Sequence, residues 1–146
     1  MFRDTSKAVD LAEIREIERN LKVTFPKQLI EHYLKYNGGN PINNFLYSEI
    51  SDIETSVQTF LPLKYKNETG YTIEDMYRHF VGRNVFSGKY LPFAMDYGGN
   101  LFCVNMENGE IVMIWLDKGE VEEEKIPVLS HSFDEFISSL EESEDY

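Results

Sequence analysis

Residues 95–105, MDYGGNLFCVN, decide between two folds, because a glycine pair stands directly before an apolar run. A phosphate-binding loop requires such glycines to lead from a strand into a helix whose N-terminal amides face the anion. Here Gly98 and Gly99 lead into an apolar run typical of a strand, and the spacing G-x-G-x-x-G does not occur. Glycine also accepts the positive φ angles of tight turns. We therefore predict that Gly98 and Gly99 form a turn between two antiparallel strands.

The segments around this turn predict a sheet. YLPFAMD (90–96) precedes it, and LFCVN (101–105) and IVMIWL (111–116) follow it. Asn108-Gly109 lies between the last two, and both residues of this hairpin dipeptide are expected at positive φ. Apolar residues at successive positions indicate central strands covered on both faces. Weaker strands are expected at 44–48, 56–65 and 121–129.

Four helices are predicted from their capping residues and apolar spacing. Asp10, Thr72 and Ser132 are each followed three residues later by an acidic residue, as in a capping box. Pro26 suits the first turn of another helix, which Gly38 is expected to end. Short turns between consecutive strands favour antiparallel pairing. The sequence therefore predicts an α+β fold.

The length of 146 residues suits one domain, expected over residues 1–146 with a short acidic tail from about residue 141. GGN occurs at 38–40 and 98–100, but its surroundings differ, so no internal repeat is predicted. Cys103 is the one cysteine and lies in an apolar run, which indicates a buried hydrophobic residue. No signal peptide and no membrane-spanning run occurs, which predicts a cytoplasmic protein without a membrane partner.

The net charge of −12 is concentrated at one end of the chain. Residues 1–106 carry 13 acidic and 12 basic residues, whereas residues 107–146 carry 13 acidic and two basic residues. Phosphates repel such a surface, so nucleic acid is not expected as a direct partner. A basic protein is a better match. A solubilising acidic surface with a frayed tail is the alternative explanation.

The densest acidic run supplies the candidate partner-binding residues, which are Asp117, Glu120, Glu122, Glu123 and Glu124. On the strand expected at 121–129, Glu122 and Glu124 share one face. Such an exposed edge could meet a basic partner. It could equally protect the edge strand from aggregation, because charges discourage edge-to-edge pairing. Trp115 is interpreted as a core residue, with a partner anchor as the alternative.

No motif in the sequence predicts catalysis. GRNVFSGKY (82–90) lacks the spacing of a phosphate-binding P-loop, and no G-x-S-x-G occurs. His32, His79 and His131 lie in separate regions without zinc-ligand spacing. We predict no catalytic residues, no cofactor and no metal. An enzyme stays a minor alternative, because residues distant in sequence can converge in space.

Three stretches together resemble the SUKH superfamily, also called the Smi/Knr-type domain. They are FPKQLIEHYLKYNGGNP (25–41), LPFAMDYGGNLFCVN (91–105) and SFDEFISSL (132–140), and the resemblance covers about residues 10–140. Residues 45–90 match no part of it. The resemblance implies a single α+β domain in which a curved, mainly antiparallel sheet is flanked by about four helices. It also implies that a structural turn is formed by Asp96, Tyr97, Gly98, Gly99 and Asn100.

The resemblance also implies a function. Bacterial members are similar to immunity proteins that neutralise toxins, often nucleases, and fungal relatives act in regulating cell-wall glucan synthesis. Neither role requires catalytic residues. The leading hypothesis is a non-catalytic protein-binding module, an immunity protein that binds a basic toxin domain directly. The alternatives are a regulatory scaffold related to cell-wall control and an uncharacterised enzyme or small-ligand binder.

Overall fold

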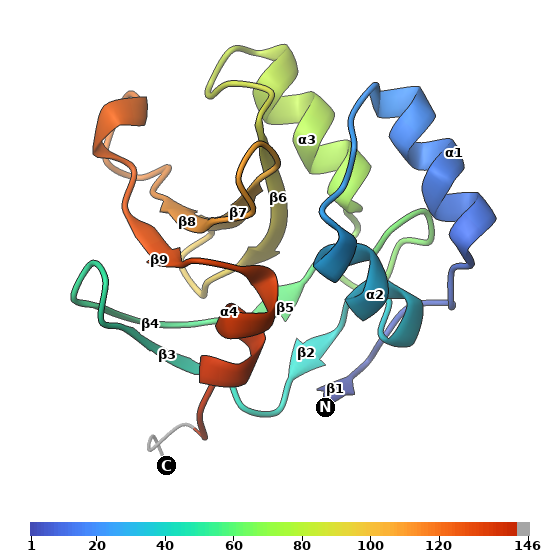
Figure 1. Cartoon of the computed structure of the whole chain (residues 1–146), viewed down its shortest axis with the longest axis horizontal. Helices are drawn as coiled ribbons and strands as arrows, with labels where there is room; N and C mark the ends of the chain where they lie inside the picture. Colours follow the sequence, from blue (N-terminus) through green and yellow to red (C-terminus); the bar gives the residue numbers. More distant parts are fainter. Residues whose placement is uncertain (143–146) are drawn as a thin grey trace.

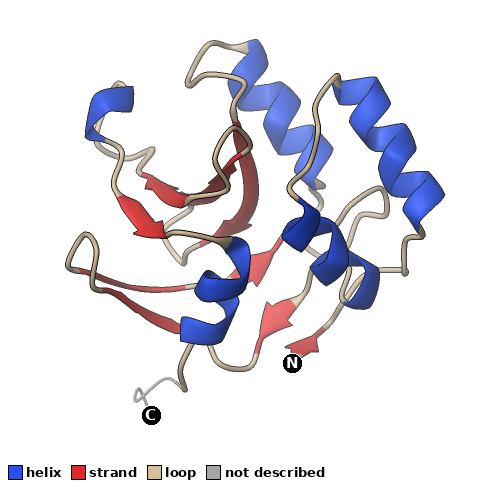
Figure 2. Cartoon of the chain, in the orientation of Figure 1, coloured by secondary structure: helices blue, strands red, loops and turns tan. Residues whose placement is uncertain are grey.

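The computed structural model describes residues 1–142, which form four α-helices and nine strands (Figures 1 and 2). In chain order these are β1 (Phe2–Arg3), α1 (Leu11–Leu21), α2 (Lys27–Lys35), β2 (Asn40–Pro41), β3 (Phe45–Ser48), β4 (Ile53–Ser56), β5 (Thr59–Phe60), α3 (Ile73–Gly82), β6 (Tyr90–Met95), β7 (Leu101–Asn105), β8 (Ile111–Ile114), the 3₁₀ helix η1 (Glu123–Lys125), β9 (Val128–Ser130) and α4 (Phe133–Ser139). The predicted α+β fold is confirmed.

Five strands form the main sheet in the order β5-β6-β7-β8-β9, and every neighbouring pair is antiparallel. The predicted pairing of 101–104 with the following strand is confirmed, with Leu101 opposite Ile114 and Val104 opposite Ile111. Two shorter sheets, β1-β2 and β3-β4, extend from it. Figure 1 shows α1, α2 and α3 gathered on the side of the molecule away from β8 and β9.

The turn between β7 and β8 is wider than predicted. The backbone N–H of Asn105 donates to the carbonyl of Glu110 at 2.8 Å, so the four residues 106–109 form the loop. Gly109 has a φ of 82°, whereas Asn108 does not adopt positive φ. The expected two-residue turn is wrong because the pairing ends before it reaches Asn108.

Aromatic residues fill the core on one face of the sheet. Phe133 and Phe136 of α4 are buried against the rings of β6 and β7. The ring centroids lie 5.2 Å apart for Phe93 and Phe133 and 5.7 Å apart for Phe102 and Phe136. Each buried aromatic ring removes a large apolar area from water, so α4 is held mainly by these two side chains.

The opposite face of the central strands is also covered, as predicted from their continuous apolar runs. Cys103 of β7 and Val112 of β8 lie there in a second cluster with Phe86 and Tyr90. Met76 and Phe80 of α3 pack against this cluster. Central strands covered on both faces need apolar residues at every position, which explains the absence of alternation in this part of the sequence.

Side-chain caps fix the helix starts where they were predicted. The Asp10 carboxylate accepts from the backbone N–H of Glu13 at 2.8 Å, and the Glu13 side chain accepts from Asp10 at 3.1 Å. Thr72 and its partner in α3 form the same reciprocal pair. The Ser132 hydroxyl accepts from the third residue of α4 at 3.1 Å. Each cap satisfies backbone donors that the first turn leaves unpaired.

Two expectations about the N-terminal half are wrong. Helix α2 ends at Lys35 rather than at Gly38, because Tyr36 already adopts an extended conformation with φ −134°. Residues 56–65 are not one strand, since β4 ends at Ser56 and β5 covers two residues. The segment after β5 is held instead by the side chain of Asn37, which accepts from the N–H of Leu63 at 2.7 Å and donates to its carbonyl at 2.9 Å.

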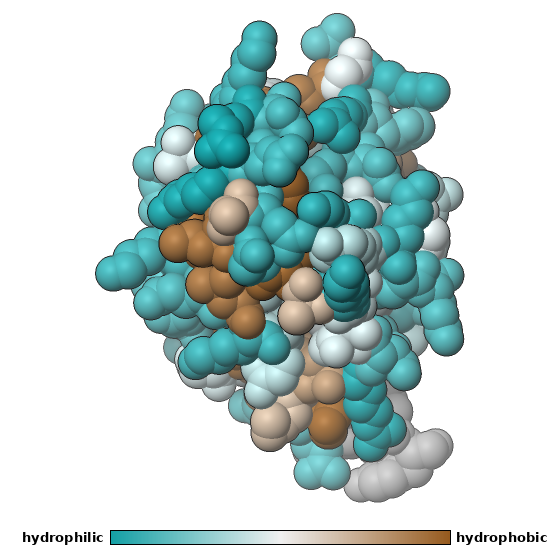
Figure 3. All heavy atoms as spheres, turned by 90° about the vertical axis from the view of Figure 1, so that its right-hand side faces the viewer, coloured by the Kyte–Doolittle hydropathy of each residue, from teal (hydrophilic) through white to brown (hydrophobic). Residues whose placement is uncertain are grey.

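The helical side of the molecule is mostly hydrophilic. Figure 3 shows this face with a patch of hydrophobic residues set among charged and polar ones. Leu11 on α1 and Leu34 on α2 are among the exposed large hydrophobic residues of the described chain. Exposed hydrophobic residues are normal on globular surfaces, and this patch by itself indicates no site.

Candidate functional site

Residues 96–100 form a rigid corner between β6 and β7. One oxygen of the Asp96 carboxylate accepts from the backbone N–H groups of Gly98 at 2.9 Å and Asn100 at 2.8 Å. The other oxygen accepts from the side-chain amide of Asn100 at 3.1 Å. Gly99 has a φ of 84°, which the corner requires. Tyr97 stands at the tip and is 65% exposed.

Asn100 ties the corner to the end of β8. Its side chain is 5% exposed, and its carbonyl oxygen accepts from the backbone N–H of Leu116 at 2.9 Å. An amide side chain carries both a donor and an acceptor, so Asn100 serves Asp96 and Leu116 at the same time. The corner is therefore connected to the segment that begins at Asp117.

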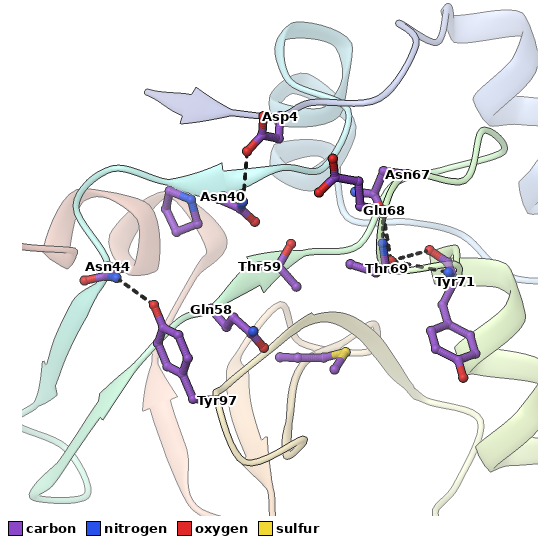
Figure 4. Close-up of a pocket in the computed structure, with 12 residues that line it drawn as sticks. Asp4, Asn40, Asn44, Gln58, Thr59, Asn67, Glu68, Thr69, Tyr71 and Tyr97 are labelled. Atoms are coloured by element: carbon purple, nitrogen blue, oxygen red, sulfur yellow. Dashed lines mark hydrogen bonds between the residues drawn. The ribbon is translucent and has the colours of Figure 1, made fainter.

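A groove of about 570 Å³ lies beside the corner (Figure 4). Its walls come from separate parts of the chain: the residue after β1, β2 with the connection to β3, the start of β5, the loop before α3, and the end of β6 with the corner. The lining residues are Asp4, Asn40, Pro41, Asn44, Gln58, Thr59, Asn67, Glu68, Thr69, Tyr71, Met95 and Tyr97. We call this the tyrosine-flanked groove, because Figure 4 shows Tyr71 and Tyr97 at its opposite ends.

Hydrogen bonds hold the side chain of Tyr97 and the backbone of Tyr71. The side-chain amide of Asn44 donates to the Tyr97 hydroxyl at 3.3 Å. The side-chain oxygen of Asn67 accepts from the backbone N–H and the hydroxyl of Thr69 at 3.0 and 2.7 Å, and the Thr69 hydroxyl accepts from the N–H of Tyr71 at 3.3 Å (Figure 4). Tyr71 is 51% exposed. Two aromatic side chains are thus presented to solvent on fixed backbone.

The chemistry of the groove favours binding over reaction. It offers side-chain amides, hydroxyls and the carboxylates of Asp4 and Glu68, and among its described lining residues none is Lys, Arg, His or Cys. Within residues 1–142, no group of three or more His, Cys, Asp or Glu side chains is arranged to hold a metal ion. The groove can donate and accept hydrogen bonds, attract a cation and stack an aromatic ring.

The acidic segment adopts a different structure from the one expected. The predicted strand over 121–129 is wrong, because Glu123–Lys125 form the 3₁₀ helix η1 and β9 begins only at Val128. The carbonyl of Glu122 accepts from the N–H of Lys125 at 2.9 Å and so closes a helical turn. Glu122 and Glu124 therefore do not line a strand edge, and protection of such an edge does not explain them.

The five predicted partner-binding residues divide into two groups. Asp117, Glu120, Glu122 and Glu124 are exposed, although Glu122 forms an ion pair with Lys125 at 2.8 Å. Glu123 is half-buried, and its carboxylate accepts from the backbone N–H of Ser87 at 2.7 Å. Glu123 thus anchors the segment to the loop after α3. The exposed negative charges of the segment belong to the other four residues.

Trp115 joins the acidic residues in a second, smaller hollow. This hollow measures about 200 Å³, and its lining includes Trp115, Glu120 and Glu122. Trp115 is half-buried against the core, as interpreted from the sequence, and the ammonium of Lys118 lies 5.6 Å from its ring centroid. The structure therefore brings part of the acidic segment against an aromatic side chain.

The remaining reactive side chains are separated in the fold. Cys103 is buried in the second cluster, and burial raises the pKa of its thiol well above the usual range. His32 lies on α2 among aromatic rings, His79 lies on α3 with its ring 4.8 Å from that of Phe80, and His131 precedes α4. No pair of these forms a nucleophile and base within the part of the chain that the structure describes.

Sequence reasoning missed most of the groove. Its residues come from segments up to 93 positions apart, from Asp4 to Tyr97, and several lie in residues 45–90, which matched no known pattern. One signal was present in the repeated tripeptide GGN. Asn40, which ends its first copy, lines the groove, and Asn100, which ends its second, holds the corner.

These features define an α+β domain with an antiparallel sheet, a polar groove and an acidic surface segment. The chain matches the family described as SMI1 / KNR4 family (SUKH-1) over residues 8–139, and it belongs to this family. The resemblance drawn from three sequence stretches is confirmed. Domains of this family generally serve as non-enzymatic immunity or regulatory modules.

A comparison with curated proteins found no match. Among residues 1–142, the helices are too short or too polar to cross a membrane.

Proposed function

We propose that this protein is a cytoplasmic immunity protein that neutralises a toxin domain by binding it directly. Family membership supports a non-catalytic binding role. The concentration of 13 acidic against two basic residues in positions 107–146 supports a basic partner. A nuclease toxin fits this description, because an enzyme that binds phosphates presents a basic surface.

The exposed acidic segment carries this proposal. Asp117, Glu120, Glu122 and Glu124 are exposed on a short stretch that is held by hydrogen bonds at Leu116 and at Glu123. The N–H of Leu116 donates to the Asn100 side chain at the beginning of the stretch, and the N–H of Ser87 donates to the Glu123 carboxylate in its middle. Charges on fixed backbone attract a basic surface without the entropy loss of ordering a flexible loop. Such charges accelerate encounter more than they strengthen the final complex.

The first test is complex formation with a toxin domain encoded beside this protein. Co-expression is expected to give a 1:1 complex on size-exclusion chromatography and to restore growth of cells that produce the toxin. A toxin domain that neither binds this protein nor is neutralised by it would overturn the proposal for that pair.

The second test separates steering charge from general acidity. In the variant Glu120→Gln/Glu122→Gln/Glu124→Gln, Glu123 is kept because it supports the backbone. We expect its association rate at low salt to fall on the order of 10-fold, and the wild-type rate to fall as ionic strength rises. The control Glu16→Gln/Glu31→Gln/Glu54→Gln removes as many exposed charges from α1, α2 and β4. Equal association rates for the two variants would contradict a role of the acidic segment.

A regulatory scaffold for cell-wall synthesis is the second candidate, and the KNR4 part of the family description favours it. This role predicts that deletion of the protein alters wall composition in the absence of any toxin. An immunity protein predicts no such effect, so wall analysis of a deletion strain distinguishes the two roles.

A further inference from the structure

We propose that the tyrosine-flanked groove binds an arginine side chain presented by a loop of the protein partner. This inference rests on the proposed function, because it takes the partner to be a basic protein. The groove then supplies the specific contact, whereas the acidic segment speeds the approach.

The charge of the groove selects a cation. Asp4 and Glu68 contribute carboxylates, and its described lining contains no Lys or Arg to neutralise them. A phosphate or carboxylate ligand would find no positive partner there and would face two negative charges. Cationic side chains are the groups that a basic partner presents most densely.

The hydrogen-bonding groups favour guanidinium over ammonium. Four side-chain amides line the groove, from Asn40, Asn44, Gln58 and Asn67. The Asn67 oxygen already accepts two bonds from Thr69, so the acceptor oxygens for a ligand are those of the two carboxylates, Asn40 and Gln58. A guanidinium group has five N–H donors in a planar fork, whereas an ammonium group is a compact and strongly hydrated charge. Several spaced acceptors therefore suit arginine.

The exposed tyrosines favour the same ligand. Guanidinium groups stack on aromatic faces, and a tyrosine surrounded by polar contacts is a common centre of binding energy. Tyr97 and Tyr71 are 65% and 51% exposed; the Tyr97 hydroxyl accepts from the Asn44 amide, and the backbone N–H of Tyr71 donates to the Thr69 hydroxyl. A prearranged site loses little conformational entropy on binding.

The position of the groove explains why a protein supplies this arginine. The corner 96–100 forms one end of the groove through Tyr97 and holds Leu116 through Asn100. Asp117, the first residue of the acidic segment, follows directly in the chain. A single partner resting on the corner can therefore reach the groove and the acidic segment together.

The inference can be tested without the partner. The probe is N-acetyl-L-arginine amide, with N-acetyl-L-citrulline amide as the neutral control of similar shape. We expect millimolar arginine amide to shift the NMR signals of the Tyr71 and Tyr97 rings, and the citrulline compound to leave them unchanged. The shifts are expected to vanish in Asp4→Asn/Glu68→Gln, whose substitutions lie at exposed positions. Equal shifts from both probes, or shifts that persist in this variant, would overturn the inference.

Complex formation provides the second readout. In a toxin complex, Tyr97→Ala is expected to raise the dissociation rate at least 10-fold, whereas Tyr97→Phe keeps the ring and is expected to change it less than threefold. Far-UV circular dichroism confirms that each variant is folded. A complex in which Tyr97→Ala dissociates like the wild type overturns the groove inference alone. Failure of the wild-type protein to bind any toxin overturns the proposed function, while the arginine probe still tests the groove.

Discussion

The tripeptide Gly-Gly-Asn occurs at two corners of this molecule, at residues 38–40 and 98–100, and its structural role differs between them. At 38–40 the chain passes between other segments, and an added Cβ on Gly39 would lie 2.6 Å from the carbonyl oxygen of Arg3. At 98–100 the same letters form an open turn, where a Cβ on Gly99 would meet no atom within 4 Å. The first corner is constrained by packing and the second by hydrogen bonds. The same short sequence can therefore secure a core or display a side chain.

Gly39→Ala is expected to have the largest effect on stability, because the added Cβ would clash with backbone atoms and the residue would also have to adopt an unfavourable φ. Its φ of 101° is unfavourable for any residue with a Cβ, and the contact with Arg3 cannot be relieved by moving a side chain. We expect the free energy of unfolding to fall by about 4 kcal/mol. Urea denaturation measures this, and a loss below about 1 kcal/mol would show that the first corner is as open as the second.

Acid is expected to weaken the surroundings of the first corner next. The ring of His32 contacts Phe2 and Phe60 at centroid distances of 5.0 and 5.6 Å, and Phe60 pairs with Gly39. Burial, aided by the N-terminal amine and Lys35, lowers the pKa of His32 from 6.5 to about 4. The folded state binds a proton at His32 less readily than the unfolded state does. The free energy of unfolding is therefore full above pH 6.5 and decreases as the pH falls toward 4. The difference is worth about 3 kcal/mol.

The measurement is the free energy of unfolding between pH 4 and pH 7, compared with His32→Leu. The variant lacks the titrating group, so its stability is expected to depend less on pH by that amount. Parallel pH profiles for the two proteins would contradict the assignment of the acid sensitivity to His32.

Asn100→Ala tests the hydrogen-bonded corner. The substitution leaves the backbone N–H of Leu116 and one oxygen of Asp96 without their partner in a partly buried site. We expect a loss of about 2 kcal/mol. Hydrogen exchange is also expected to accelerate at Leu116, whereas exchange in α1 stays unchanged. Uniform acceleration throughout the molecule would mean that the corner is coupled to the whole fold.

Gly99→Ala is expected to lower the stability least, and it provides the direct comparison with Gly39→Ala. Its φ of 84° carries a conformational penalty of about 1 kcal/mol, and no contact adds to it. Gly98→Ala serves as the matched control, because Gly98 does not adopt positive φ and its added Cβ would meet only side-chain atoms, at 3.4 Å or more. A loss for Gly99→Ala as large as that for Gly39→Ala would remove the distinction between the corners.

The sequence predicts this fold well where local rules determine it. Capping boxes at Asp10 and Thr72 and the apolar run before Asn105 gave the correct helices and the correct strand pairing. The sequence fails where side chains from distant segments determine the backbone. The backbone around Leu63 is held by hydrogen bonds to the Asn37 side chain and does not form the strand that its sequence favours. Glu123–Lys125 form a 3₁₀ helix, and Glu123 binds the backbone of Ser87.

The candidate site follows the same division. The acidic segment was visible because its charges are consecutive, although their arrangement in space was not. The tyrosine-flanked groove was invisible, because amides such as Asn44 and Gln58 are common in loops and gain meaning only when the fold brings them to Tyr97. Spatial assembly from short polar loops leaves no periodicity for a sequence pattern to detect.

The burial of Cys103 has a practical consequence for fluorescence work. It is the one thiol of the chain, and it lies buried on β7 with its pKa raised by burial. Thiolate is the form that maleimides attack, so the folded protein offers no competing site for a dye. A cysteine introduced at an exposed position such as Glu124 can therefore carry a single label within the proposed contact region. The extent of labelling at Cys103 instead measures the fraction of molecules in which β7 has become exposed by local or global unfolding.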